Sequence, residues 1–376
     1  MEIAIAGAGI AGLTAAITLA GRGFSVRLFE RADVLADIGA GIQLAPNAMT
    51  VLQRLGLADA LAAEVVEPRA LIIRDGPGGR ALTAIPLRDE ARRRYGSPYC
   101  VIHRADLQRI LSDAADAEPK IQLKLGAEIA DVRQDGNRVT FALDGQSLDA
   151  DLLIAADGIH STIRTGALAL PAASQPIRHA WRTAIAADDL PAGIERDATG
   201  LWLESHCHIV HYPVRAGNQI NIVLIATNDR TGPGESLKKL AAPASGLAGV
   251  QTDWIGWPLR AIDPAGRWAR GRIALIGDAA HAMLPTAAQG GAQAIEDAFV
   301  LANCLAETPD QPAAALQRYE KRRKTRVMRV ANEAQRNATI YGLGGLAATA
   351  RNAAIALLPG PMHLHRLDWL YRFPQD

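Results

Sequence analysis

The sequence has little cysteine, few aromatic residues and no excess of charge of either sign. Only three cysteines occur among 376 residues (Cys100, Cys207 and Cys304), and their wide spacing argues against a disulfide framework or a zinc ribbon. The 40 basic and 39 acidic residues nearly cancel, so no overall field favours nucleic acid or a membrane surface. No apolar run approaches the roughly 20 residues of a membrane span, and no secretory signal is visible. We therefore expect a cytoplasmic protein without a metal site, a nucleic-acid partner or a membrane anchor.

The length of the chain exceeds what one compact core usually holds and predicts about two domains. The order of predicted strands and helices indicates an α/β fold: a Rossmann-like domain with an inserted β-sheet domain and C-terminal helices. The division that we expect is the following: a first domain from residues 1–70, 98–172 and 268–311, an inserted sheet domain from residues 71–97 and 173–267, and a helical segment from residues 312–376.

A glycine motif follows the first predicted strand. Residues 2–6 predict a buried strand, residues 10–20 a helix and residues 25–30 a second strand. Between the first two lies G-A-G-I-A-G, with Gly7, Gly9 and Gly12. In such a motif the first glycine permits a tight turn, the second lets the backbone approach a pyrophosphate, and the third lets helix and strand pack closely. Glu30 ends the second strand, where it can accept hydrogen bonds from ribose and would repel a 2′-phosphate, which favours FAD or NAD over NADP.

A second segment, Arg272–Ala298, has the features of a cofactor site about 270 residues later. A predicted strand runs into Gly277-Asp278, a loop with Pro285 follows, and Gly290-Gly291 open a helix. The Asp278 carboxylate can accept hydrogen bonds from a polyol chain, and the free N–H groups of the helix start can hold an anionic ring oxygen. Two such segments suggest one long cofactor that is bound at both ends.

The rest of the chain is less specific. The turn Asp157-Gly158 follows a predicted strand over 151–156 and taken alone could be any strand-to-helix corner. Residues 177–227 alternate apolar and polar side chains, which predicts a half-buried sheet. Residues 312–350 read as helical, and for their basic run over 321–329 a solvated helix face is favoured over an interaction patch.

Three short motifs occur in one order after the first glycine motif: His103-Arg104-Ala105-Asp106-Leu107, Asp157-Gly158 and Gly277-Asp278. With this set the chain resembles the class A FAD-dependent aromatic hydroxylases, the family of para-hydroxybenzoate hydroxylase. It is most similar to the branch of salicylate hydroxylase, 3-hydroxybenzoate 6-hydroxylase and 6-hydroxynicotinate 3-monooxygenase. The resemblance covers nearly the whole chain, including the closing segment 367–371.

The resemblance implies FAD as cofactor, NADH or NADPH as co-substrate, and O2. It implies that FAD reduced by NAD(P)H forms a C4a-hydroperoxide, which hydroxylates a small aromatic or N-heteroaromatic acid of the salicylate, hydroxybenzoate or hydroxynicotinate type. The implied cofactor residues are Gly7, Gly9, Gly12, Glu30 and Arg31 for the ADP half, Arg104 for the pyrophosphate, Gly277 and Asp278 for the ribitol, Gly290 and Gly291 for the pyrimidine edge, and Asp157 and Gly158 for FAD and NAD(P)H together. The family has no separate NAD(P)H domain, and this chain has no second G-x-G-x-x-G.

Histidine is the expected partner of the substrate hydroxyl, because an aromatic ring reacts more readily when its hydroxyl loses a proton. On a strand over 206–212, His208 and Tyr212 share a face that His211 does not, so a three-histidine metal site is disfavoured. In related hydroxylases a His and a Tyr four residues apart line the substrate pocket, which His208 and Tyr212 match. We expect His208 to be the base or hydroxyl partner, with a plain sheet-surface histidine as the alternative and His211 as second choice.

Further pocket residues follow from the resemblance. Pro285 matches a family proline near the substrate hydroxyl and the flavin. Thr286 stands where relatives carry His or Gln, so it leaves more room in the pocket, and the identity of the substrate stays open. Gln43 and Asn47 are expected beside the flavin and the pocket. Candidates for binding a substrate carboxylate are Arg92, Arg182 and Arg215.

Two other functions are considered. An FAD-dependent oxidase or dehydrogenase could use a related fold, although the Asp157-Gly158 signature argues against it. A flavin-binding redox sensor would need a reactive surface cysteine or an added partner segment, and neither is seen in the sequence. The protein is expected to be a monomer or a homodimer, and helices around Gly342–Gly345 could mediate the dimer.

Overall fold

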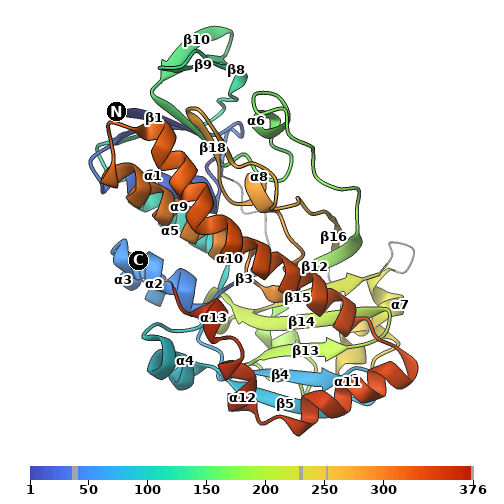
Figure 1. Ribbon diagram of the computed structural model, residues 1–376. Helices are drawn as coiled ribbons and strands as arrows, with labels where there is room; N and C mark the ends of the chain where they lie inside the picture. Colours follow the sequence, from blue (N-terminus) through green and yellow to red (C-terminus); the bar gives the residue numbers. More distant parts are fainter. Residues whose placement is uncertain (36–40, 228–231, 251–252, 374–376) are drawn as a thin grey trace.

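The computed structural model describes residues 1–35, 41–227, 232–250 and 253–373, and places two large β-sheets one beyond the other, flanked by helices (Figure 1). The expected mixed α/β fold is confirmed. Within the described residues the predicted elements occur close to their predicted bounds.

The first sheet has six strands in the order β17-β18-β11-β1-β2-β7, all parallel except β17. Its strands are β1 (Glu2–Ala6), β2 (Ser25–Phe29), β7 (Ile121–Lys124), β11 (Leu152–Ala155), β17 (Ala269–Arg270) and β18 (Ile273–Leu275). Helix α1 (Ile10–Ala20) contacts both α5 (Arg104–Asp116) and α9 (Gly290–Glu307). The central strands β1, β11 and β18 are buried along almost their whole length, which explains their nearly continuous apolar sequences.

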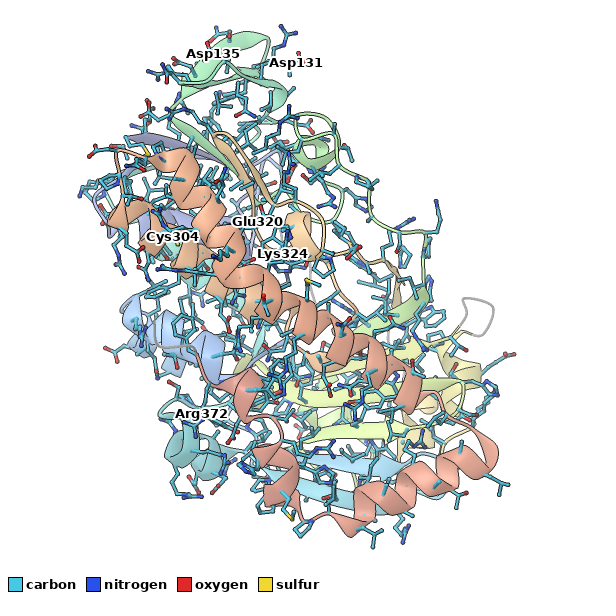
Figure 2. All side chains as sticks on the ribbon, in the orientation of Figure 1. Asp131, Asp135, Cys304, Glu320, Lys324 and Arg372 are labelled. Carbon is cyan, nitrogen blue, oxygen red and sulfur yellow. The ribbon has the colours of Figure 1, made fainter. Side chains whose placement is uncertain are left out.

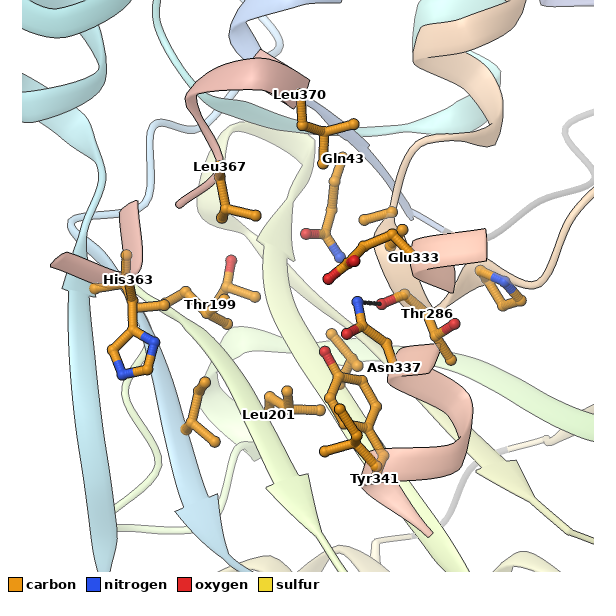
Figure 3. A pocket seen from close by; sticks show the side chains of 18 of the residues that line it. Gln43, Thr199, Leu201, Thr286, Glu333, Asn337, Tyr341, His363, Leu367 and Leu370 are labelled. Carbon is orange, nitrogen blue, oxygen red and sulfur yellow. Dashed lines mark hydrogen bonds between the residues drawn. The ribbon is translucent and has the colours of Figure 1, made fainter. Parts of the chain in front are cut away.

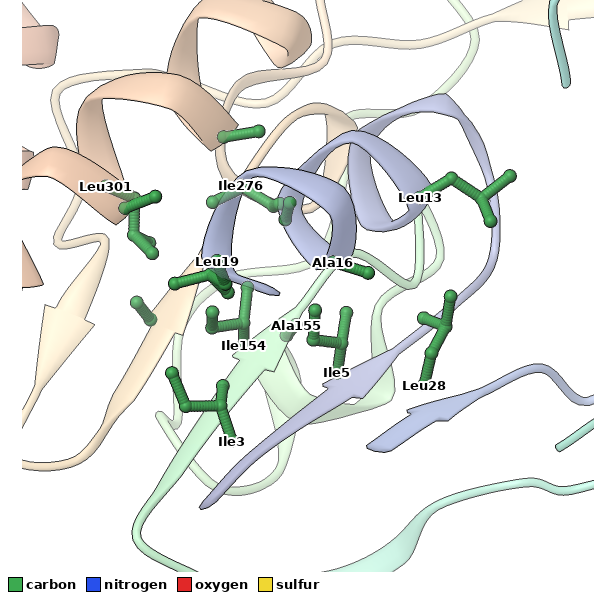
Figure 4. Packing of buried hydrophobic residues seen from close by; sticks show 14 of the residues in the cluster. Ile3, Ile5, Leu13, Ala16, Leu19, Leu28, Ile154, Ala155, Ile276 and Leu301 are labelled. Atoms are coloured by element: carbon green, nitrogen blue, oxygen red, sulfur yellow. The ribbon is translucent and has the colours of Figure 1, made fainter. Parts of the chain in front are cut away.

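The core of this layer lies between α1 and the central strands (Figure 4). Ile3 and Ile5 from β1, Leu28 from β2 and Ile154 from β11 are fully buried, and Leu13 from α1 packs with them. Burying each such side chain contributes about 1.5–3 kcal/mol. This packing fixes the carboxyl ends of β1, β11 and β18 together, where the glycine motifs begin.

The second sheet has seven strands in the order β16-β12-β15-β14-β13-β4-β5, antiparallel except for the pair β13–β4. The strands are β4 (Ala70–Asp75), β5 (Ala81–Pro86), β12 (Arg178–Ala186), β13 (Thr199–Leu203), β14 (Cys207–Val214), β15 (Gln219–Ala226) and β16 (Ile255–Leu259).

The expectation that this sheet is half-buried is wrong for its central strands. All five residues of β13 and seven of the eight in both β14 and β15 are buried. One face packs against Leu237 of α7 (Pro233–Leu237) and Leu247 of η3 (Ala244–Gly249). The other packs against Ala334 and Ala338 of α10 (Pro312–Tyr341). Cover on both faces therefore overrides the alternating pattern in the sequence.

Two small sheets complete the strands. β3 (Gly41–Leu44) pairs with β6 (Cys100–His103), and Gly41 also donates its N–H to Asn221 of the large sheet at 2.7 Å. The other small sheet joins β8 (Ala130–Gln134), β9 (Val139–Leu143) and β10 (Gln146–Ala150). The β3 strand thus connects the two layers beside the glycine motif.

Helices cover the outer parts of both layers. The remaining ones are α2 (Pro46–Arg54), α3 (Ala58–Ala62), α4 (Arg88–Tyr95), α6 (Thr162–Thr165), α8 (Asp278–His281), α11 (Gly345–Leu357), α12 (Gly360–His365) and α13 (Asp368–Tyr371), with 3-10 turns η1 (Ala187–Asp189), η2 (Arg215–Gly217) and η4 (Pro285–Ala287). Of the helices within the described ranges, none is long and apolar enough to cross a membrane.

The long helix α10 runs beside both sheets (Figure 1). Its basic run was expected to be a solvated face, which is wrong for Arg323 and Arg326. The Arg323 guanidinium is 2% exposed and pairs with Glu296 and Asp297 of α9, and Arg326 also pairs with Glu296. Lys324 instead pairs with Glu320 on its own helix (Figure 2). The run therefore anchors α10 on α9.

Candidate active site

Two cavities adjoin each other between the layers. The smaller, of about 300 Å³, lies at the glycine motifs, and the larger, of about 600 Å³, lies beneath α10 and the C-terminal helices (Figure 3). Both are lined by Gln43, Val210, Ile225, Pro285 and Ala288. The five shared residues form the boundary across which a molecule in one cavity would face a molecule in the other.

The three glycines of the first motif have different surroundings. A Cβ on Gly7, whose φ is +98°, would lie 2.5 Å from the carbonyl oxygen of Ala156, and a Cβ on Gly12 would lie 1.9 Å from that of Gly7. A Cβ on Gly9 would meet no atom within 4 Å, and Gly9 lines the smaller cavity. The first and third glycines are therefore required by packing, while the second leaves room for a ligand against the backbone.

The carboxylate of Glu30 is held by backbone N–H groups that follow β1 and β2. It accepts hydrogen bonds from the N–H of Ala8 at 2.8 Å and of Ala32 at 3.0 Å. Glu30 is half-buried and Arg31 is exposed, and neither is among the described residues that line the smaller cavity. Glu30 therefore fixes the turn that follows β1, and its role toward a ribose stays a prediction, as does that of Arg31.

The second glycine motif lines the same cavity from α9. Gly290 and Gly291 begin this helix, and a Cβ on Gly290 would again meet nothing within 4 Å. Asp278 is exposed and lines the cavity, next to Gly277, whose φ is +57°. Because the first N–H groups of a helix lack partners within the helix and carry partial positive charge, this end of the cavity suits an anionic atom.

Two arginines add positive charge to the smaller cavity. Arg104 and Arg182 both line it, and burial lowers the pKa of the Arg182 guanidinium. The Nε of Arg182 is buried without a hydrogen-bond partner among the described residues. Of the arginines considered for a carboxylate, only Arg182 reaches a cavity; the other two pair elsewhere, Arg92 with Glu67 and Arg215 with Asp106.

Gly158 lines the smaller cavity, whereas Asp157 stands behind it. The Asp157 carboxylate accepts a 3.4 Å hydrogen bond from the N–H of Ile163 in α6, and its Oδ1 is buried without a partner in the part of the chain that the structure describes. Burial raises the pKa of Asp157 despite the hydrogen bond to Ser161. Open backbone at Gly9 and Gly290 together with the two cations Arg104 and Arg182 fits a large anionic cofactor such as FAD.

The larger cavity is mainly apolar with polar groups at separate points. Its apolar wall comes from strands of the second sheet and from the C-terminus: Leu71, Ile73, Ile85, Leu201, Val210, Ile225, Leu367 and Leu370. Gln43 lies at the boundary, where its Oε1 accepts a hydrogen bond from the Tyr99 hydroxyl. Such a cavity suits a flat apolar ring with a few polar substituents.

His208 lies in the larger cavity, where its ring meets that of Tyr341 with a centroid distance of 5.2 Å. Burial, with the nearby Arg178, lowers the pKa of His208 to about 3, so the imidazole is neutral near pH 7. Tyr212 instead lines the smaller cavity, and burial raises its pKa. The predicted pair thus divides between the cavities, because the boundary crosses β14 near Val210.

His211 and Asn47 are placed away from both cavities. His211 is fully buried on the other face of β14, where a Cβ on Gly200 would lie 2.0 Å from its Nε2. Asn47 is also fully buried and donates hydrogen bonds to Glu296 at 2.6 Å and Gln289 at 3.0 Å. Neither side chain lines a cavity in the described ranges, so the structure does not bring them together with His208.

Pro285 and Thr286 line the larger cavity, and their implied contacts with substrate and flavin stay predictions. Residues that the sequence reasoning missed face them from α10: Glu333, Asn337 and Tyr341, four residues apart. That spacing marks one face of a helix and could have identified the strip. Thr199 of β13 was also missed; its hydroxyl is buried without a partner among the described residues and lines the cavity, and no local motif points to it.

Comparison with known proteins gives a family match over most of the chain. Residues 1–334 match the model of the family described as FAD binding domain. The chain is 34% identical to 3-hydroxybenzoate 6-hydroxylase 1 of Aquipseudomonas alcaligenes, over 98% of this chain and 97% of that protein. It is 36% identical to 3-amino-4-hydroxybenzoate 2-monooxygenase of Streptomyces cremeus, over 99% of this chain and 95% of that protein.

Solved structures agree with these matches. The crystal structure of Klebsiella pneumoniae HpxO complexed with FAD and uric acid superposes with a TM-score of 0.86 at 27% identity, covering 98% of this chain and 95% of that chain. The similarity therefore includes both layers and the C-terminal helices.

Proposed function

Because the chain belongs to the family of FAD-dependent aromatic hydroxylases, we propose that it hydroxylates a small aromatic or N-heteroaromatic acid that already carries a ring hydroxyl. NADH or NADPH and O2 are the co-substrates. The observation that carries the proposal is the shared boundary at Gln43, Pro285 and Ala288, where a cofactor site meets a mainly apolar cavity with room for a small ring.

The smaller cavity holds FAD in this proposal. Gly9, Gly290 and Gly291 offer backbone N–H groups, Asp278 accepts from the polyol chain, and Arg104 and Arg182 balance negative charge. When bound, FAD would be reduced by the nicotinamide and would then activate O2. The protein has to orient the ring and keep water away, which the apolar wall of the larger cavity does.

His208 orients the ring through its hydroxyl. A neutral imidazole accepts a hydrogen bond from a phenol, which draws electron density toward the ring. Because burial lowers the pKa of His208 to about 3, full proton transfer to it is unfavourable, and the role of hydrogen-bond partner is favoured over that of base. Thr286, which is smaller than the His or Gln expected there, leaves room beside the ring.

The kind of ring is suggested by the relatives. One is named for 3-hydroxybenzoate and another for 3-amino-4-hydroxybenzoate, and the solved neighbour holds uric acid. A hydroxylated, planar, polar-substituted ring is common to the three. No observation in the structure favours the oxidase alternative.

The wider predictions also belong to this proposal. Residues 1–70, 98–172 and 268–311 would form the FAD-binding domain and residues 71–97 and 173–267 the substrate domain. This division is supported by the separate strands of the two large sheets. A cytoplasmic location and a monomeric or homodimeric state stay predictions.

The test is NADH and NADPH oxidation by the FAD-loaded protein against salicylate, 3- and 4-hydroxybenzoate, 3-amino-4-hydroxybenzoate, 6-hydroxynicotinate and urate, with product and peroxide both measured. We expect at least one ring to accelerate oxidation and to appear as a hydroxylated product. Acceleration that yields only peroxide would show a wrong ring. A flavin that neither nicotinamide reduces, with any ring present, would contradict the proposal.

A further inference from the structure

One wall of the larger cavity presents mainly oxygen atoms that accept hydrogen bonds. The wall consists of Glu333 and Asn337, one turn apart on α10, and Thr286 of η4 (Figure 3). We call these three residues the acceptor wall. It faces the boundary residue Gln43, so a ring in the cavity would lie against it.

The orientation of Asn337 is fixed by its neighbour. Its Nδ2 donates to the backbone carbonyl of Thr286 at 3.2 Å, as drawn in Figure 3. The reverse orientation would set two oxygens against each other, so the amide oxygen is left free to accept, while Nδ2 keeps one further N–H. No described residue donates to that oxygen, which leaves it available to a ligand.

Thr286 also presents a hydrogen-bond acceptor to the cavity. Its hydroxyl proton is donated to the carbonyl of Ala334. Because a hydroxyl has one proton, only its lone pairs are left for the cavity. The Thr286 side chain therefore presents an acceptor to the cavity.

The third member is the carboxylate of Glu333. Its side chain is 28% exposed, and the nearest cation is Arg336 at 3.6 Å, whose own side chain is 58% exposed. A partly solvated pair at this distance is weak, so one carboxylate edge stays open to the cavity. Figure 3 shows this carboxylate between Gln43 and Asn337.

The cationic side chains that line the larger cavity lie at its margin. Arg329, Arg336 and Arg366 are exposed residues, and Arg329 stacks on Trp369 at 3.7 Å. A substrate carboxylate is therefore favoured at the solvent-facing end, away from the acceptor wall. The part of the ring that meets the acceptor wall has to carry donors.

From this polarity, and resting on the proposed function, we propose that the substrate bears an amino group or a ring N–H that donates to the acceptor wall, with Glu333 as the specificity-determining residue. A ring acid that presents a methyl group or a bare C–H at that position leaves the Glu333 carboxylate without a donor. The enzyme then selects among hydroxylated rings by their nitrogen substituent.

The test measures how tightly each ligand binds to the FAD-loaded protein, using the change in the flavin absorption spectrum. It therefore does not depend on turnover. The ligand pair is 3-amino-4-hydroxybenzoate against 3-methyl-4-hydroxybenzoate, which differ by NH2 for CH3 at similar size. A second pair is 6-hydroxynicotinate, which carries the ring nitrogen, against 4-hydroxybenzoate. We expect the nitrogen-bearing member of at least one pair to bind roughly tenfold tighter, since a charge-assisted hydrogen bond contributes about that much.

In Glu333→Gln we expect that preference to fall roughly tenfold, chiefly through weaker binding of the nitrogen-bearing ligand. The control is Glu307→Gln, the same chemical change at a carboxylate that is 46% exposed and pairs with Arg322 on the surface; it should keep the wild-type preference. Equal affinities within both pairs, no detectable binding of any of the four ligands, or equal loss for both members of a pair in Glu333→Gln would overturn the proposal. If the preference holds but no ring yields a hydroxylated product, the proposed function fails and the acceptor wall stands.

Discussion

The two adjoining cavities are built in different ways. The smaller is lined in large part by backbone, with Gly9, Gly41, Gly158, Gly290 and Gly291 in its wall. The described lining of the larger contains no glycine and draws on side chains from β4, β13, β14, α10 and the C-terminal helices. A backbone wall suits a cofactor that is the same in every relative, whereas a side-chain wall can change with the ring. The difference separates what the family shares from what this chain selects.

Among substitutions near the smaller cavity, we expect the largest effect from Gly12→Ala. A Cβ there would lie 1.9 Å from the carbonyl oxygen of Gly7, so Gly12→Ala should displace the first turn of α1. We expect FAD affinity to fall more than a hundredfold and the thermal midpoint of the apoprotein to fall as well, measured by flavin absorbance and calorimetry.

The matched variant is Gly9→Ala. Its Cβ would meet nothing within 4 Å in the protein, so the apoprotein should keep its thermal midpoint while FAD binds more weakly. If Gly9→Ala destabilises the apoprotein as much as Gly12→Ala, the distinct roles given to the two glycines are wrong.

The next largest effect is expected at Arg323 of α10. Burial raises the pKa of Glu296 and Asp297, but Arg323 and Arg326 lower that of Glu296, and His281 and Arg323 lower that of Asp297. The side chains of Arg323, Glu296 and Asp297 are almost fully buried. Arg323→Met should cost about 3–5 kcal/mol in the free energy of unfolding, because two buried carboxylates lose a shared cation.

Arg322→Met is the control for this cluster, since Arg322 pairs with a half-exposed carboxylate on the surface. It should cost less than about 1 kcal/mol in a urea titration. Similar costs for the two variants would mean that the buried cluster does not anchor α10 on α9.

A substitution in the larger cavity should leave FAD binding unchanged. In His208→Gln we expect kcat/KM for the preferred ring to fall about 10–100-fold, the effect of a lost oriented hydrogen bond, while FAD content stays unchanged. His206→Gln, two residues away and exposed, is the matched control and should behave as wild type. Loss of FAD in His208→Gln would show that the cavities do not act separately.

The smallest effect concerns acid stability. Burial, with Arg74 nearby, lowers the pKa of His211 to about 4 from 6.5, so the folded protein holds this imidazole neutral while the unfolded chain binds a proton. The contribution is fully present above pH 6.5 and is lost as the pH falls from 6.5 toward 4. His211→Leu should flatten the pH dependence of unfolding in this range by at most about 1.4 kcal/mol per pH unit, measured by urea titrations. An unchanged slope would contradict the buried neutral state.

The same contrast explains what the sequence could predict. Gly7, Gly9 and Gly12, like Gly290 and Gly291, act through backbone geometry within a few residues, so their motifs could be recognised without a structure. The α/β fold followed from the order of such local signals. Pro285, Thr286 and Gln43, which the resemblance implies for the pocket, line the larger cavity, and their roles toward a substrate stay predictions.

The rest depends on contacts between distant segments. Asn47 looked like a pocket residue because of its loop, but its amide bonds to Glu296, which also pairs with Arg323, and no local pattern connects three positions so far apart. Tyr212 could be placed on the face of His208, but not in the other cavity, because the boundary is set by Pro285 and Gln43. The acceptor wall needs the contact of α10 with η4.

The central claim is that oxygen activated at the smaller cavity reaches a ring in the larger one. The most direct measurement is turnover of the best panel ring under 18O2, with the product analysed by mass spectrometry. We expect one 18O atom in each hydroxylated product molecule. A product whose new oxygen comes from water, or NAD(P)H oxidation that ends only in peroxide for every ring that binds, would contradict it.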